Sequence, residues 1–286
     1  MATTPKKPVA RLEVKKTYKL YINGAFPRSE SGRVYEVLTS KGASVANPSL
    51  ASRKDLRDAV VAARAAQSGW AKATAYNRGQ ILYRIAEMLE GRTDQLVTEI
   101  SLATGVSTKK AHDEVLAAID RWVWYAGWSD KLSAAFGSTN PVSGPYYNFT
   151  IPEPQGVIAV APAESFLAFI DAIAPAIVSG NTVVALVPGS AAIAAMTFAE
   201  VLATSDLPAG VINILTGSHD ELAPWAASHM DIDGFDISGI SKKKRAELKA
   251  SGAENLKRIH HFEGALSPTR IYAFMEAKTV WHPIGV

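Results

Sequence analysis

The spacing of apolar positions changes several times along the chain, and each change marks a new kind of element. Residues 1–16 are mostly polar and basic, which predicts a flexible arm. The segment Tyr18-Lys19-Leu20-Tyr21-Ile22, followed by the turn dipeptide Asn23-Gly24, predicts a short strand that enters a tight hairpin. A second strand is expected near 33–38.

Three long amphipathic segments follow. Apolar residues recur every three or four positions over 53–68, 76–103 and 108–135, which predicts helices with one buried face. Gly91 and Thr93 predict a break inside the second segment, because a glycine and a new cap there would end one helix and begin another.

An aromatic stripe lies in the third of these segments. Trp122, Tyr125 and Trp128 recur every three residues and therefore share one helix face. We interpret this stripe as core packing and not as a surface on which a ligand stacks.

Residues 139–155 are rich in glycine, proline, serine and asparagine, and Tyr147, Phe149 and Ile151 alternate with polar positions. This composition predicts a β-hairpin or an extended arm. The last stretch, 270–281, is expected to be a strand with no helix after it.

From residue 156 onward, short apolar runs alternate with helical segments. Strands are expected at 156–161, 181–187, 211–215, 233–237 and 256–262. Helices are expected at 166–178, 191–204, 219–228 and 241–251. This alternation predicts an α/β fold, a Rossmann-like, doubly wound parallel sheet with helices on both faces.

Composition then excludes several classes of function. The chain of 286 residues is 48% hydrophobic, so it can bury a core, and its net charge of +3 does not indicate a nucleic-acid or membrane partner. It contains no cysteine, which excludes disulfides, thiolate metal sites and a cysteine nucleophile. The apolar run 167–178 is too short to span a bilayer, and no secretory signal is visible, so we expect a cytoplasmic protein.

Five stretches of sequence together resemble the aldehyde dehydrogenase superfamily. Tyr21-Ile22-Asn23-Gly24 resembles its opening hairpin, and Gln155-Gly156-Val157-Ile158 resembles the entry to its coenzyme domain. The other three are Gly180-Asn181-Thr182-Val183-Val184, Asp206-Leu207-Pro208-Ala209-Gly210 and Asn255-Leu256-Lys257-Arg258. The resemblance runs from about residue 18 to 268, and it is strongest to the non-catalytic second module of the two-module, family 16-like branch.

The resemblance also locates the positions where such an enzyme keeps its catalytic groups. Chemistry of this kind needs a cysteine thiolate, an oxyanion donor and a carboxylate base. No cysteine exists, the oxyanion asparagine falls on Ser165, and the base glutamate falls on Phe262. Glu263 is one position later, and one step along a strand turns a side chain to the opposite face, so we expect it to be no substitute.

The coenzyme positions are altered as well. The lysine that contacts the cofactor ribose in the family falls on Val187, which weakens the expected affinity for NAD(P) without excluding it. The candidate cofactor-binding residues that mark the expected crevice are Ser165, Pro188, Ser190, Gly217, Ser238 and Gly239. The alternative interpretation is that these positions are structural.

Beyond Pro268 the family continues into a catalytic domain, whereas here 274–286 resembles the family's C-terminal tail. We therefore expect a coenzyme-type domain with its oligomerisation strands retained and the catalytic domain deleted. The expected parts are a flexible arm (1–16), N-terminal hairpin and helices (17–138), an oligomerisation hairpin (139–155), Rossmann-like βα repeats (156–268) and a C-terminal oligomerisation strand (269–286).

Two further clusters have ordinary interpretations. Lys242-Lys243-Lys244-Arg245 opens an expected helix, where cations oppose the helix dipole, and we interpret it as a solvated face, with an acidic or phosphate partner as the alternative. His260-His261 is not expected to bind a metal, because neighbouring strand residues point to opposite faces.

The sequence thus predicts a catalytically inactive aldehyde dehydrogenase homologue, a structural or regulatory subunit. Its expected partner is a full-length aldehyde dehydrogenase subunit or a second copy of itself, bound through 142–152 and 270–281. The alternative function is a module that binds or senses a nicotinamide cofactor without turnover.

Overall fold

The computed structural model describes residues 16–39, 41–264 and 266–285. Its centre is a parallel sheet of five strands in the order β7-β6-β5-β8-β9. The bounds of these strands are β5 (Val157–Val160), β6 (Thr182–Val187), β7 (Ile212–Thr216), β8 (Gly234–Asp236) and β9 (Arg258–His260). The order confirms the predicted doubly wound α/β fold, because the chain builds outward from β5 on one side and then returns to its other side.

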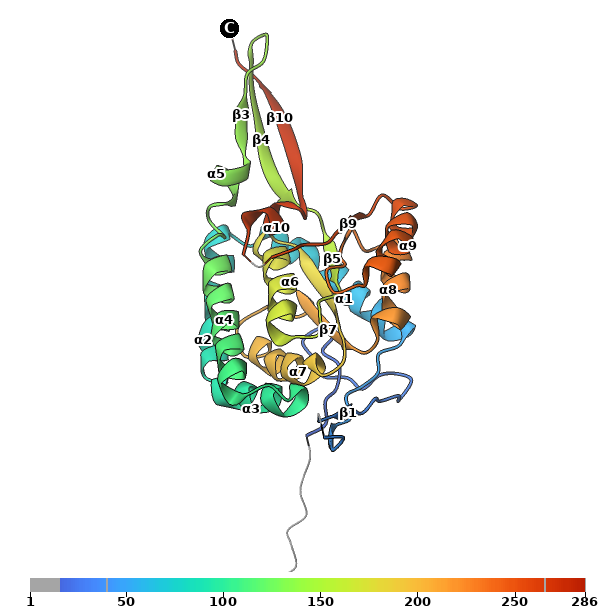
Figure 1. The fold of residues 1–286 in the computed structure, drawn as a ribbon. Coiled ribbons are helices and arrows are strands. Elements are labelled where there is room, and N and C mark those ends of the chain that lie inside the picture. The colour runs from blue at the N-terminus through green and yellow to red at the C-terminus, as the bar shows by residue number, and fades with distance from the viewer. Residues whose placement is uncertain (1–15, 40, 265, 286) are drawn as a thin grey trace, which may run out of the picture.

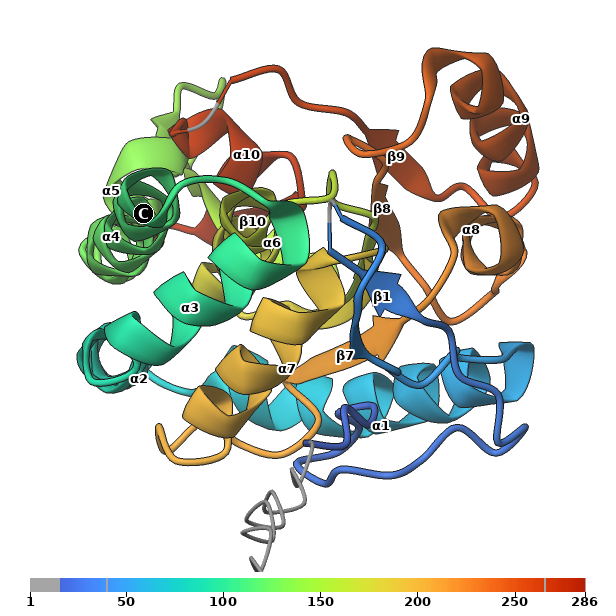
Figure 2. The ribbon, with the colours of Figure 1, turned by 60° about the horizontal axis from the view of Figure 1, so that its bottom comes forward.

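Helices cover both faces of this sheet (Figure 2). Those on the first face, directly or in a second layer, are α2 (Ala75–Glu90), α3 (Thr93–Thr104), α4 (Thr108–Ala126), α6 (Phe166–Val178) and α7 (Ala191–Leu202). Those on the second face are α1 (Arg53–Lys72), α8 (His219–Ser228) and α9 (Lys242–Ala253). Apolar strand residues alternate between these two cores, and the central strands β5 and β6 are buried along their whole length.

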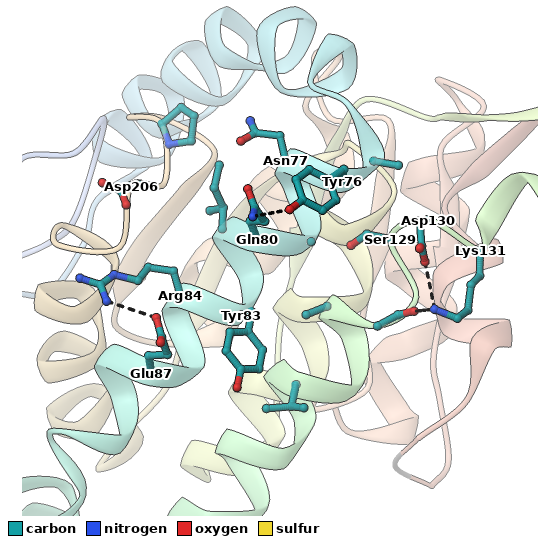
Figure 3. A pocket seen from close by; sticks show the side chains of 17 residues that line it. Tyr76, Asn77, Gln80, Tyr83, Arg84, Glu87, Ser129, Asp130, Lys131 and Asp206 are labelled. Carbon is teal, nitrogen blue, oxygen red and sulfur yellow. Dashed lines mark hydrogen bonds and ion pairs between the residues drawn. The ribbon is translucent and has the colours of Figure 1, made fainter.

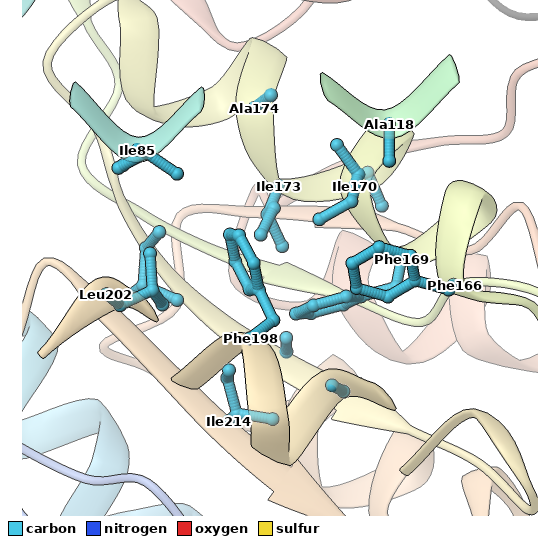
Figure 4. Packing of buried hydrophobic residues seen from close by; sticks show 14 of the residues in the cluster. Ile85, Ala118, Phe166, Phe169, Ile170, Ile173, Ala174, Phe198, Leu202 and Ile214 are labelled. Carbon is cyan, nitrogen blue, oxygen red and sulfur yellow. The ribbon is translucent and has the colours of Figure 1, made fainter. Parts of the chain in front are cut away.

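The first core is aromatic at its centre. Phe198 of α7 packs against both Phe166 and Phe169 of α6, with ring centroids 6.0 and 5.8 Å away (Figure 4). Trp122 of α4 stacks on Phe198 at 5.6 Å. Trp122 and Tyr125 are buried, so the prediction that the aromatic stripe is core packing is confirmed for both. Large buried rings of this kind supply much of a core's stability.

A three-stranded antiparallel sheet stands off from the body (Figure 1). We call this sheet the arm, and its order is β10-β4-β3, with β3 (Ser138–Asn140), β4 (Tyr146–Pro154) and β10 (Met275–Pro283). The hairpin of β3 and β4 follows α5 (Leu132–Phe136), and β10 pairs with the whole of β4 from Met275–Pro154 to Pro283–Tyr146. The segments 139–155 and 270–281, both predicted to contain strands, are thus neighbours in space.

Several expected elements differ in the structure. No strand forms over 18–22, where only single bridges join Tyr21 to Ile214 and Ile22 to Ala25; a small sheet instead pairs β1 (Val37–Leu38) with β2 (Ser44–Ala46). The long helix expected over 108–135 is instead two helices, because α4 ends at Ala126 and a turn separates it from α5.

The expected strand over 270–281 also needs correction. A short helix, α10 (Pro268–Tyr272), precedes β10, and its N-cap Ser267 and the proline at its first turn are the signals that form it. The expected arm over 1–16 lies outside the described residues except for Lys16, whose ammonium pairs with Glu200 at 2.8 Å. In the part of the chain that the structure describes, no helix is long and apolar enough to cross a membrane.

Candidate functional site

The six candidate cofactor residues all lie at one edge of the parallel sheet. Ser165 follows β5, Pro188 and Ser190 follow β6, and Gly217 follows β7. Ser238 and Gly239 come directly after β8. In doubly wound folds, ligands bind outside the carboxyl ends of the strands, where the strand order reverses, and here that point lies at β5 and β8.

The loops that follow β5 and β8 are in backbone contact at this point. The Gly239 amide donates to the Ala161 carbonyl at 2.8 Å. A Cβ at Gly239 would lie 2.2 Å from the carbonyl oxygen of Pro162, so only glycine allows this approach. The contact joins the loops that follow the two central strands, β5 and β8.

The serines of the crevice already have hydrogen-bond partners. Ser165 is the N-cap of α6, and its hydroxyl accepts from the Ala168 amide at 3.0 Å. Ser190 precedes α7, and both its amide and its hydroxyl donate to Glu164, at 2.8 and 2.9 Å. Gly217 donates its amide to the carbonyl of Val187 at 3.0 Å, which joins the ends of β7 and β6.

Glu164 therefore places a carboxylate at the N-terminus of α7. Helix N-termini attract anions because their first amides are free and the dipole is positive there. The side chain lies so close to Gly189 that a Cβ on that glycine would be 2.1 Å from a carboxylate oxygen. A side chain of the protein itself thus occupies a helix N-terminus that could otherwise bind an anionic ligand.

A cavity of about 450 Å³ opens beside this carboxylate, between 35–39, the end of α3 and the β6–α7 loop. Tyr35 borders it and donates its hydroxyl to the Gly189 carbonyl at 3.0 Å. Burial, with the nearby Glu164 carboxylate, raises the pKa of the Tyr35 phenol, which therefore stays protonated. Glu36 also lines the cavity, so two carboxylates face it and disfavour a phosphate.

A second, smaller cavity of about 240 Å³ lies between α8 and α9. Ala223, Pro224, Ile240 and Leu248 give it apolar walls. An ion pair crosses between the two helices here, from Lys244 to Asp220 at 2.5 Å. The cavity is next to the loop of Ser238 and Gly239 along the chain, and the charged side chains of Asp220, Lys244 and Glu247 border it together with the apolar ones.

His219 also lines this α8–α9 cavity. Its Nε2 lies 2.8 Å from the Leu186 carbonyl, so that nitrogen carries the proton. Burial lowers the pKa of His219, which keeps the ring neutral at pH 7.

A buried polar cluster lies under α10 at the ends of β8 and β9. Asp236 ends β8 and is 1% exposed, and Arg270 of α10 reaches its carboxylate at 3.5 Å. Ser238 donates both its amide, at 2.8 Å, and its hydroxyl to the same carboxylate. Burial raises the pKa of Asp236, while the hydrogen bonds from Ser238 and the charge of Arg270 act in the opposite direction.

Phe262 completes this cluster. Its amide donates to the Ser238 hydroxyl oxygen at 2.9 Å, and the Arg270 guanidinium lies over its ring, 4.8 Å from the centroid. The ring also packs on His260 and Phe274, at 5.9 and 6.1 Å between centroids. The position where the resemblance expected a catalytic base is thus a packed aromatic side chain, and Glu263 beside it is exposed.

The four basic residues at the start of α9 make different contacts. Lys242 and Lys243 are exposed, and Lys244 pairs with Asp220. Arg245 is different, because it donates to the carbonyls of Ile240 at 2.8 Å and Ser238 at 3.0 Å and so fixes the β8–α9 loop. Within the described ranges, no group of three or more histidine, aspartate or glutamate side chains could hold a metal ion.

A further cavity, of about 940 Å³, lies far from this sheet edge on the outer side of α2 and α4 (Figure 3). Tyr76 and Tyr83 of α2 project into it, and Tyr76 accepts a hydrogen bond from Gln80 at 2.9 Å. Arg84 pairs with Glu87 along the same helix at 3.2 Å. The residues that line this cavity include no cluster of groups suited to catalysis. No feature of the sequence predicted the cavity.

Sequence reasoning also missed Glu164, Asp236 and Arg270. The first two follow or end a buried strand of the parallel sheet, which is a usable signal for a site residue. No such sequence signal marks Arg270, because its partner Asp236 is 34 residues away along the chain.

The strand order, the helices on both faces and the crevice at the carboxyl ends define a Rossmann-like coenzyme-type domain. Residues 26–281 match the model of the aldehyde dehydrogenase family, and the chain belongs to that family. Human retinal dehydrogenase 2 is 35% identical over 273 residues, which are 93% of this chain and 52% of that protein. An aldehyde dehydrogenase of Emericella nidulans is 31% identical over 99% of this chain and 57% of its own length.

Solved structures agree with this assignment. PnpE from Pseudomonas sp. WBC-3 superposes with a TM-score of 0.82 at 25% identity, over 87% of this chain and 51% of its own. A putative aldehyde dehydrogenase from Burkholderia cenocepacia gives 0.82 at 27% identity over the same shares. The chain therefore spans about half the length of the relatives that it matches.

Proposed function

We propose that the chain is a catalytically inactive member of the aldehyde dehydrogenase family that serves as a structural or regulatory subunit, together with an active aldehyde dehydrogenase or with itself. The main support for the proposal is the residue that stands at the position of the family's catalytic base. There Phe262 is packed against His260 and Phe274 under the guanidinium of Arg270. No cysteine exists among the 286 residues to attack an aldehyde.

The arm supports the assembly role. Strand β10 lies at the edge of its sheet, and Tyr146, Tyr147 and Trp281 are 42, 47 and 58% exposed on the arm. An open strand edge next to exposed aromatic side chains is the kind of surface that a protein partner covers.

The test is to co-express this chain with an aldehyde dehydrogenase encoded in the same genome. We expect no aldehyde oxidation by the chain alone with NAD⁺ or NADP⁺, and a mixed oligomer with the active enzyme. Replacing Trp281 and Tyr146 by serine should reduce that mixed oligomer, and replacing the exposed Tyr76 and Tyr83 of α2 by serine provides a matched control. Aldehyde oxidation by the purified chain would refute inactivity, and failure to associate would refute the hetero-assembly.

A second candidate function is the binding of a nicotinamide cofactor without turnover. A solved structure of PnpE contains nicotinamide adenine dinucleotide, and it superposes on this chain with a TM-score of 0.81 at 25% identity. The cavity between α8 and α9 favours this candidate, while Glu164 at the N-terminus of α7 opposes it. Calorimetry with NAD⁺ and NADP⁺ tests it, and the absence of heat at millimolar cofactor would reject it.

A further inference from the structure

A groove lies between the start of α1 and the end of α8, two helices that are neighbours on the second face of the parallel sheet (Figure 2). We call it the α1–α8 groove. Its volume is about 670 Å³, and Leu56, Trp225 and Met230 are among the residues that line it. Trp225 is 41% exposed and Met230 is 77% exposed, so the groove presents large apolar side chains to solvent.

Three basic side chains of α1 border the same groove. Arg53, Lys54 and Arg57 are all exposed. Glu30 is the one acidic side chain among the described residues that line the groove, and it lies 3.7 Å from Lys54. Burial lowers the pKa of His229, which also lines the groove, so its imidazole is neutral at pH 7. The positive charge of the groove therefore comes from α1.

Arg53 differs from the other two basic residues because it forms no ion pair in the part of the chain that the structure describes. Lys54 and Arg57 each have a carboxylate nearby, and that of Arg57 is Asp58 at 3.1 Å. The Arg53 guanidinium lies instead over the Trp225 ring, 3.9 Å from its centroid. A guanidinium held over an aromatic ring can still offer the N–H groups along its edge to a carboxylate.

We propose that the α1–α8 groove binds an acidic segment of a partner protein. A carboxylate of that segment pairs with Arg53, and an apolar side chain next to it packs on Trp225 and Met230. Arginine, tryptophan and methionine are enriched at protein interfaces, and arginine and tryptophan often supply much of the binding energy. The groove shares no described residue with the arm, so the proposal goes beyond the assembly role above and does not depend on it.

The charges of the groove favour such a segment over a nucleic acid. A phosphate backbone is bound by a series of cations, whereas here Glu30 lies beside Lys54, and Asp58 pairs with Arg57. The chain as a whole carries a net charge of only +3. An acidic segment with an apolar side chain matches both features of the groove, the unpaired Arg53 and the apolar walls.

A displayed library of random peptides provides the first test. We expect selection on the unmodified chain to enrich peptides in which aspartate or glutamate adjoins a large apolar residue. The same selection on Arg53→Gln should no longer enrich the acidic residues. Selection of peptides without acidic residues on the unmodified chain would overturn the proposal.

Calorimetry with one selected peptide, made by synthesis, then measures the role of each side chain. Its affinity should fall about tenfold to a hundredfold in Arg53→Gln, because a charged hydrogen bond is lost. It should also fall in Met230→Ser, and the exposure of Met230 makes this variant unlikely to disturb the fold. Arg84→Gln is the matched control, since Arg84 is an exposed arginine that lines a different cavity, and it should leave the affinity unchanged.

Three further outcomes would overturn the proposal. The first is an equal affinity of the peptide for Arg53→Gln and Arg84→Gln. The second is a single-stranded RNA oligonucleotide that binds the unmodified chain but not Arg53→Gln, which would assign the groove to nucleic acid. The third is a dimer in light scattering that Trp225→Ser converts to a monomer, which would assign it to a second copy of the chain. None of these results bears on the association with an active dehydrogenase, which the co-expression experiment measures separately.

Discussion

Glu164 and Ser190 are joined twice: one carboxylate oxygen of Glu164 accepts from the amide of Ser190 at 2.8 Å and from its hydroxyl at 2.9 Å. This pair connects the loop after β5 to the first turn of α7. A carboxylate bound there stabilises the helix through its dipole, and it also occupies the position that an anionic ligand would take.

Removal of this charge should therefore increase affinity for NAD⁺. We expect Glu164→Gln to bind NAD⁺ about tenfold more tightly than the unmodified chain, because a fixed negative charge near a helix N-terminus costs a phosphate on the order of 1–2 kcal/mol. Isothermal titration calorimetry measures the change. Glu36→Gln is the matched control, since Glu36 lines the same cavity and has no hydrogen bond to α7 among the described residues. Equal affinities of the two variants would contradict this role of Glu164.

The ion pair of Asp236 and Arg270 is buried, with side chains 2 and 7% exposed. Arg270→Met leaves the Asp236 carboxylate without its cation in the core, and we expect a loss of about 3–5 kcal/mol in the free energy of unfolding. The double variant Asp236→Asn with Arg270→Met should lose less, because it removes both charges. Urea denaturation of the unmodified chain and of these two variants measures the free energies of unfolding.

The control for that experiment is Arg84→Met, which breaks the exposed pair of Arg84 and Glu87 on α2. Such surface pairs contribute about 0–1 kcal/mol. A loss in Arg270→Met no greater than in Arg84→Met would show that the buried pair does not stabilise the fold.

Much of the fold follows from the sequence because the buried central strands are short, mostly apolar runs that alternate with helical segments. Helices α6 and α8 have the predicted bounds, and each begins after a serine whose hydroxyl caps it, Ser165 and Ser218. The segment 18–22 is different. Its Tyr21 forms a single bridge with Ile214, so a distant strand and not local pattern decides its conformation.

The sequence predicts where the candidate site lies, but it does not predict which polar side chains bond to one another there. The parallel order places every loop after a strand at one edge, so the loop residues named from the family resemblance lie along that edge. Which polar groups neutralise one another there depends on loop conformation. Glu164 bonds to Ser190 across 26 residues, and Asp236 to Arg270 across 34, and neither spacing has a periodic signal.

Lys257 gives a prediction about pH. Its ammonium is buried and donates to the carbonyls of His229, at 2.7 Å, and Ile232. Burial lowers the pKa of Lys257 to about 8 from 10.5. Below about pH 8 the lysine is charged in both the folded and unfolded states, so the full cost of burying the charge is present.

Between about pH 8 and 10.5 the unfolded chain binds the proton more tightly than the folded one, so this group makes stability rise with pH. We expect the difference in melting temperature between the unmodified chain and Lys257→Met to shift in favour of the unmodified chain across this window. Lys249→Met, on the exposed side of α9, should show no such shift. A constant difference for Lys257→Met would mean that the ammonium is not desolvated.

The contact between the β5 and β8 loops gives the last prediction, and it concerns the glycine that allows it. In Gly239→Ala the new methyl group would lie 2.2 Å from the carbonyl oxygen of Pro162 and 2.5 Å from the amide nitrogen of Ala163. Both are backbone atoms, so one loop must move, and we expect the free energy of unfolding to fall by about 1–3 kcal/mol. Gly69→Ala is the control, because nothing lies within 4 Å of a Cβ there and alanine favours the interior of α1, so this variant should gain about 0.5–1 kcal/mol. If Gly239→Ala were as stable as Gly69→Ala in thermal and urea unfolding, the loops would be free to separate, and the crevice at the switch point would be open to a ligand.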